Sequence, residues 1–219
     1  MANATVLPED IDRSFHLLLR WEEEFARSLA RAVLDKPEIS VWMILIPILL
    51  LHHVHRIRQY RTGFLSFAEG VLRTKKLALE MAREELMKGK GLDDGRTPLP
   101  PPAPEFTSAD LEAPEPIALE DAHMAEVALL KSHFRLLLAQ RGTTHVELIR
   151  GAYRTAGEYR SFLQRLAEAE AQVHRAVLAS RRGDEESREV VSKMEAAAAR
   201  LRDLEIHLIF GRGASPAGP

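Results

Sequence analysis

The sequence contains no cysteine, so the chain can form no disulfide bond and offers no thiolate to a metal. This absence fits a body that faces the cytoplasm. Glycine-rich phosphate loops, the dinucleotide fingerprint and the Gly-x-Ser-x-Gly turn are also missing, as are the Cys-x-x-Cys-His and His-Glu-x-x-His motifs. We therefore expect a protein that is not an enzyme, that has no cofactor or metal, and that has no evident small-molecule substrate.

An excess of charge of one sign is also missing. The 219 residues include 30 Lys and Arg against 32 Asp and Glu, which gives a net charge of −2. Nucleic-acid-binding domains are usually basic, so nucleic acid is not an expected partner. The first residues show no basic stretch followed by an apolar core and a small-residue cleavage site, so we expect no secretory signal peptide.

One long uncharged run stands out. It covers 13 residues, from Ile39 to Leu51, and histidines and arginines follow it directly. As a helix it would be about 20 Å long, shorter than the roughly 30 Å of a bilayer's hydrocarbon core. Lys36 and Arg56 lie on opposite sides of the run and can extend the inserted length by snorkelling. We interpret it as a membrane segment. The expected boundary residues are Trp42, Pro47, His52, His53, His55, Arg56, Arg58 and Arg61.

Three arrangements of this run remain open. It can cross the membrane once, or Pro47 can kink it so that it dips into one leaflet and returns. It can instead form a buried seam in a soluble helical assembly. If it crosses, basic residues outnumber acidic ones over residues 54–90, and the positive-inside rule puts the C-terminal body in the cytoplasm. The expected location is a membrane, with single-pass or monotopic attachment.

The histidines beside the run are the only candidates for a cofactor. His52 and His55 are three residues apart, so both rings can lie on one side of a helix. No second pair accompanies them, so a metal or haem would need ligands from a partner. They give the alternative of an accessory subunit of a membrane enzyme, respiratory or transport complex, with this cluster near a cofactor or ion path.

The remaining sequence predicts helices separated by one linker. Residues 1–37 contain an amphipathic helix from about Pro8 to Leu34, with Ile11, Phe15, Leu18, Phe25 and Leu29 on its apolar face. Two fates are open to this face, the membrane interface and packing against another helix. Residues 38–90 combine the membrane segment with a basic amphipathic helix, and residues 91–118 form a proline-rich linker.

Residues 119–210 predict a coiled-coil-like module ahead of a tail over residues 211–219. One helix covers about 119–140. A second begins with the capping box of Thr144 and Glu147 and continues for roughly 35 residues. A third follows Gly183 and Asp184, and we favour an antiparallel hairpin or three-helix module. The residues expected in packing or assembly are Leu163, Leu166, Val173, Val177, Val190, Met194, Leu201, Leu204 and Leu208.

Together these features predict an all-α protein. We expect a membrane-anchored helical adaptor or scaffold, whose partners are membrane lipid and either a protein or a second copy of the chain.

Overall fold

The computed structural model describes residues 7–34, 68–88, 115–180 and 185–211. Every regular element in these ranges is a helix, so the all-α prediction is confirmed. The apolar run, the residues from 89 to 114 and those from 212 to 219 lie outside the described residues. The helices are α1 (Pro8–Val33), a helix over residues 68–87 that we call the 68–87 helix, α4 (Glu115–Leu138), α5 (His145–Ala152), α6 (Ala156–Ser180) and α7 (Glu185–Phe210).

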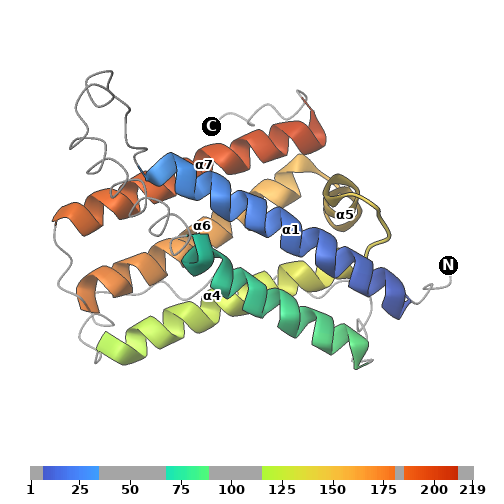
Figure 1. Cartoon of the computed structure of the whole chain (residues 1–219), viewed down its shortest axis with the longest axis horizontal. Coiled ribbons are helices and arrows are strands. Elements are labelled where there is room, and N and C mark those ends of the chain that lie inside the picture. Colours follow the sequence, from blue (N-terminus) through green and yellow to red (C-terminus); the bar gives the residue numbers. More distant parts are fainter. Residues whose placement is uncertain (1–6, 35–67, 89–114, 181–184, 212–219) are drawn as a thin grey trace, which may run out of the picture.

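Helix α6 lies at the centre of the arrangement. It packs against α4 on one side and α7 on the other, and α1 crosses over α7 (Figure 1). The 68–87 helix lies beside α4 and α1, and the short α5 closes one end. Helices α6 and α7 contact each other and run in opposite directions (Figure 1). Coiled-coil packing between them stays a prediction.

Helix α1 begins as predicted. Pro8 occupies its first turn, where a missing N–H costs no hydrogen bond, and Glu9 and Asp10 lie at the positive end of the helix dipole. Ile11 and Leu18 are buried on its inner face, which packs in the core with residues of α4 and the 68–87 helix. In the described part of the chain, the apolar face of α1 therefore packs against other helices, which is one of the two arrangements that the sequence left open.

The helix predicted from Thr144 to about residue 181 is in fact two helices. Thr144 accepts a hydrogen bond from the Glu147 N–H at 3.2 Å and starts α5 as expected. Helix α5 ends after eight residues, and Thr155 then accepts from the Glu158 N–H at 3.1 Å to start α6. Glu158 in turn accepts from the Arg154 N–H at 2.8 Å. This second Thr-x-x-Glu box explains the break, because it satisfies the N–H groups of a new helix start.

The buried face of α7 follows the predicted stripe only in part. Heptad spacing assigned Leu201, Leu204 and Leu208 to packing or assembly; Leu201 is half-buried, Leu204 is 59% exposed and Leu208 is 76% exposed. The residues that turn inward are Ala197, Ala198, Arg202, Glu205, Ile206 and Ile209. The inner face is therefore rotated by about one residue, because ion pairs and hydrogen bonds draw Arg202 and Glu205 toward α6.

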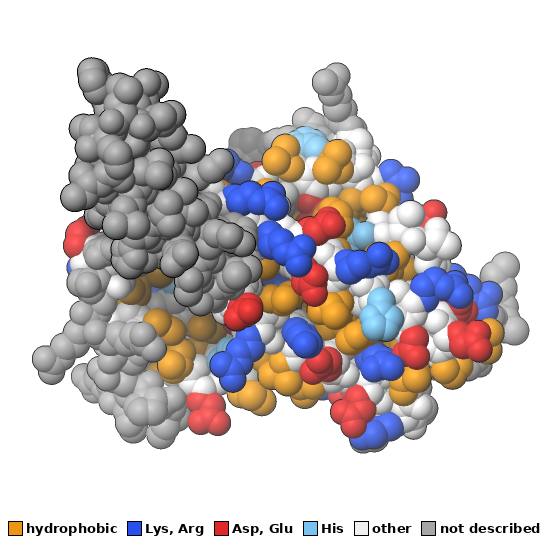
Figure 2. Space-filling view, in the orientation of Figure 1, with side chains coloured by type: hydrophobic (Ala, Val, Ile, Leu, Met, Phe, Trp, Pro, Cys, Tyr) orange, Lys and Arg blue, Asp and Glu red, His pale blue; other side chains and the backbone are white. Residues whose placement is uncertain are grey.

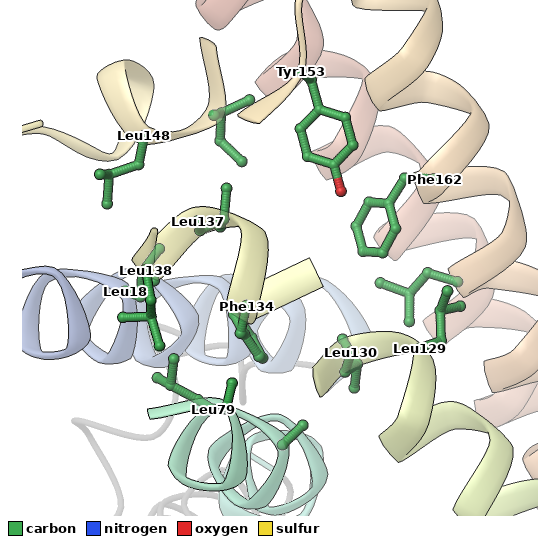
Figure 3. Packing of buried hydrophobic residues seen from close by; sticks show 14 of the residues in the cluster. Leu18, Leu79, Leu129, Leu130, Phe134, Leu137, Leu138, Leu148, Tyr153 and Phe162 are labelled. Carbon is green, nitrogen blue, oxygen red and sulfur yellow. The ribbon is translucent and has the colours of Figure 1, made fainter. Parts of the chain in front are cut away.

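One hydrophobic core joins segments that lie far apart in the sequence. Leu18 from α1 and Leu79 from the 68–87 helix meet Phe134 and Leu138 of α4 (Figure 3). Phe162 of α6 lies on the other side of the same core. Residues of α5 and α7 belong to it too. The described residues before the apolar run, those of the 68–87 helix and those of the C-terminal helices thus share a core.

Helix α4 begins at Glu115, within the stretch predicted as linker. Pro116 falls in its first turn, a position where proline is tolerated.

The last turn of α7 is joined to α5. The Arg150 guanidinium donates to the Ile209 carbonyl, with an Nε–O distance of 2.8 Å. This contact satisfies a free carbonyl in the last turn of α7 and connects that turn to α5.

Candidate functional site

A cavity of about 630 Å³ lies where α1, the 68–87 helix, α4, α6 and α7 meet. Most of its wall is apolar, including Leu29, Val71, Ala171, Met194 and Ala198. Its volume falls in the range of about 300–1,000 Å³ that is usual for pockets holding small organic molecules.

The cavity lies beside the point where the chain leaves and re-enters the described body. Ala26 and Ala30 of α1 form one small cluster with Ala68 at the start of the 68–87 helix. Leu29 and Gly70, close to these positions in the sequence, both line the cavity. The two described ends that flank residues 35–67 are therefore close together and close to the cavity.

Two buried ion pairs cross the interior. Lys75 Nζ lies 2.6 Å from Glu22 Oε2, and both side chains are largely buried. Lys75 also lies over the Phe25 ring, 4.0 Å from its centroid. Arg202 of α7 donates to both carboxylate oxygens of Glu170 on α6, at 2.6 and 2.8 Å. The deeply buried cations thus already have counterions.

Glu126 is a further carboxyl group on the cavity wall. Only 10% of its side chain is exposed, and its nearest ionisable contact is His123 Nδ1 at 4.0 Å. Burial, together with the negative charge of Glu170, raises the pKa of Glu126 to about 7. This carboxyl group is therefore a buried acceptor close to its titration point at neutral pH.

Glu205 of α7 is also a buried carboxyl group. It accepts a hydrogen bond from the Tyr159 hydroxyl at 2.9 Å, and His145 Nε2 lies 3.7 Å from the same oxygen. Burial raises the pKa of Glu205 to about 7, while burial and the charge of Lys75 lower the pKa of His145 to about 3. The imidazole is therefore neutral, and it stacks on the Trp21 ring at 4.0 Å between centroids.

A small second cavity of about 20 Å³ lies beside these groups and is lined by Trp21, His145, Tyr159 and Glu205 among others. It is large enough for one water molecule. His145 Nδ1 is buried and has no hydrogen-bond partner among the described residues. Nearby, the Tyr153 hydroxyl and His133 Nδ1 are 2.7 Å apart, and burial lowers the pKa of His133.

The outer face shows mixed charge. In Figure 2 basic and acidic side chains alternate over α1 and the 68–87 helix. Arg83 pairs with Asp12 at 2.8 Å, and Lys131 pairs with Glu85 at 2.7 Å. Two basic residues of the 68–87 helix, Lys75 and Arg83, thus form ion pairs with α1.

The residues predicted for packing or assembly fall into three groups. Leu163 and Leu166 are buried in the core. Val173 and Met194 line the cavity, and Val177 and Leu201 are half-buried. Val190, Leu204 and Leu208 are exposed, and their part in packing or assembly stays a prediction. The predicted membrane-boundary residues, His52 and His55 included, lie outside the described residues.

The described helices hold no group of three or more His, Asp or Glu side chains placed to bind a metal ion. None of these helices is long and apolar enough to cross a membrane. The chain matches no protein-family model, no curated protein and no solved structure. The arguments on function therefore rest on the residues themselves.

Sequence reasoning missed the buried polar residues Glu22, Lys75, Glu126, Arg202 and Glu205. Each is a charged residue on an amphipathic helix, where the usual position is the solvent-exposed face. The partners come from distant helices, such as Lys75 and Glu22, which are 53 positions apart. One weak signal exists, because Glu126, Glu205 and Arg202 lie next to or within the apolar stripes of their helices.

Proposed function

We propose that the chain is a non-catalytic helical adaptor held on one face of a membrane by a re-entrant segment at Ile39–Leu51. The observation that carries this proposal is the buried cluster of Ala26 and Ala30 of α1 with Ala68, which brings together the helices before and after the apolar run. Since both flanking helices belong to one core, they lie on the same side of any membrane that the run enters.

A single crossing would put α1 and the 68–87 helix on opposite sides. A crossing followed by a return would carry Arg56, Arg58 and Arg61 through the hydrocarbon, where each arginine costs at least about 2.5 kcal/mol. A shallow dip that turns near Pro47 avoids both difficulties, because proline removes a backbone donor and favours a kink. The shortness of the run, about 20 Å as a helix, supports the same choice.

The surface proposed for the adaptor's partner is the exposed apolar stripe on α7. Leu204 and Leu208 are one helical turn apart and largely exposed, and Leu201 continues the stripe. Attachment to a membrane raises the local concentration of such a surface, so a modest apolar contact is sufficient for assembly. The occupant is a second copy of the chain or a helical partner protein.

Alkaline carbonate extraction tests the membrane attachment. Cells express the full chain or a chain lacking residues 39–51, and we expect only the full chain to stay in the membrane pellet. Release of both chains would contradict the proposal and favour the soluble assembly in which the run is a buried seam.

Labelling of single cysteines tests the re-entrant geometry, and the lack of natural cysteine leaves no background. Arg13→Cys lies on α1 and Arg188→Cys lies on α7, at side chains that are 60% and 63% exposed. In sealed inverted vesicles a membrane-impermeant maleimide should label both positions. Labelling of only one of them would show that the run crosses the membrane once and would overturn the proposed geometry.

A further inference from the structure

The apolar walls of the cavity suit an organic molecule. The carboxyl group of Glu126 on the wall limits which organic molecules can bind. Apolar side chains from α1, the 68–87 helix, α6 and α7 surround most of it. The charged groups buried deepest on its wall are Lys75, Glu126, Glu170 and Arg202. Lys75 and Arg202 are held by Glu22 and Glu170, so Glu126 is the one of these four that has no charged partner closer than 4.0 Å among the described residues.

We propose that this cavity binds a small amphipathic amine, whose ammonium group pairs with Glu126 and whose apolar body lies along Leu29, Val71 and Met194. An anionic ligand would meet Glu126, and the two buried cations on the wall are already paired, while Arg160 on the same wall is only half-buried. A neutral apolar ligand would leave the Glu126 carboxyl buried without a hydrogen-bond partner, which is costly. An ammonium group supplies both the charge and the donors that this carboxyl lacks.

The surroundings of Glu126 favour the same ligand. Burial and the negative charge of Glu170 raise the pKa of Glu126, so the carboxyl group keeps its proton more readily when no cation is bound. A bound ammonium group would stabilise the carboxylate form instead.

Binding of the amine should therefore depend on pH. The groups that act on Glu126 are Glu170 from α6, Lys75 from the 68–87 helix and Arg202 from α7. His123, on the same helix, also lies beside it, at 4.0 Å. The carboxylate form of Glu126 increases between about pH 5 and pH 8, because its pKa is raised to about 7. Affinity should rise over this range as Glu126 loses its proton.

Calorimetric titration of the full chain tests this proposal. The chain is placed in phosphatidylcholine nanodiscs, with empty nanodiscs as the blank, or in buffer if carbonate extraction releases it. The probes are octylamine, octanol and octanoate, which share one alkyl chain and differ in the head group. We expect one octylamine per chain, with affinity at least about tenfold higher than for either other probe.

Two variants separate the charge from the volume. Glu126→Gln keeps the shape and should weaken octylamine binding at least about tenfold, while Glu120→Gln on the exposed face of α4 is the matched control and should leave it unchanged. Gly70→Leu places a side chain on the cavity rim, where an added Cβ meets no atom within 4 Å. It should weaken all three probes without disturbing the fold.

Three results would overturn the proposal. They are an absence of heat above the blank, equal octylamine affinity in wild type and Glu126→Gln, and octanol binding as tightly as octylamine. Nanodiscs containing oleylamine, which stays in the bilayer, identify the source of the amine. Competition with octylamine would show that the cavity takes amines from the membrane, and its absence together with octylamine binding would show that it takes them from water.

Discussion

The Tyr159 hydroxyl donates a 2.9 Å hydrogen bond to Glu205 and thereby joins α6 to α7 inside the protein. Glu205 also faces His145, which is neutral, and the buried charges of Glu22, Lys75 and Arg202 act on it. Among the residues that the structure describes, its environment therefore contains a donor for one oxygen but no cation in direct contact. This arrangement favours the protonated carboxyl group and makes the stability of the protein dependent on pH.

Replacing Glu205 with glutamine should stabilise the protein at pH 8. Because the pKa of Glu205 is raised to about 7, the folded state binds more protons than the unfolded state between about pH 4.5 and 7. The stability that this proton contributes is complete below pH 4.5 and is lost as the pH rises through 7. Glu205→Gln removes the loss and keeps an acceptor for Tyr159, so the free energy of unfolding at pH 8 should rise by on the order of 1–3 kcal/mol.

Urea denaturation at pH 5 and pH 8 measures this difference. Glu120→Gln, on the exposed face of α4, serves as the control and should show no such change. The lowered pKa of His145 acts in the opposite direction, since its stabilisation is present above pH 6.5 and is lost as the pH falls toward 3. An equal effect of Glu205→Gln at pH 5 and pH 8 would contradict the proton-linked explanation.

The sequence was sufficient for the helices with clear start signals, such as Pro8 with its acidic turn and the capping box at Thr144. It misled us where two signals disagreed. Ile149, Ala152, Ala156 and Tyr159 keep a helical spacing through the break, and this continuity obscured the second capping box at Thr155. A Thr-x-x-Glu box inside an apolar stripe can thus mark a new helix.

The candidate site was much less predictable than the fold. A charged residue such as Arg202 is buried only because Glu170 from another helix neutralises it, and local periodicity carries no information on such a partner. The small residues of α7 added a second difficulty. Ala197 and Ala198 are both buried, so an alanine-rich helix offers no clear choice of inner face, and the predicted face was displaced by about one residue.

Replacing Lys75 with methionine should strongly destabilise the protein. The change keeps the apolar stem beside Phe25 but leaves Glu22 as a buried carboxylate without its cation. Removing one partner of a buried ion pair typically costs about 3–5 kcal/mol. Thermal or urea unfolding at pH 7 measures the loss.

The double variant Glu22→Gln/Lys75→Met should recover much of this loss, because neither side chain then carries a charge. Lys76→Met is the exposed control. Its side chain is 52% exposed and lies 4.0 Å from Glu80, so its effect should stay within about 0.5 kcal/mol. Equal destabilisation by Lys75→Met and Lys76→Met would show that the buried pair has no special role.

Replacing Thr155 with alanine should destabilise the start of α6. The Thr155 hydroxyl accepts from the Glu158 N–H, and loss of such an N-cap usually costs about 1 kcal/mol. Thr155→Ser keeps the hydroxyl and should retain most of the stability. A lower urea midpoint with an unchanged slope is the expected signature of the alanine variant. Identical midpoints for alanine and serine would mean that the cap does not stabilise α6.

Replacing Leu204 and Leu208 with aspartate should abolish assembly without unfolding the chain. Both side chains are exposed, so the charges remain in water and the helical circular dichroism should stay unchanged. Two carboxylates in the middle of an apolar interface would oppose its burial. Light scattering should therefore show a smaller assembly than the wild-type chain forms.

Leu163→Ala is the comparison, because its side chain lies in the core and its loss should cost about 2–5 kcal/mol of stability. Wild-type assembly that persists in the double aspartate variant would exclude this stripe as the contact surface, and helical content that falls as it does in Leu163→Ala would contradict the exposed placement of the two leucines.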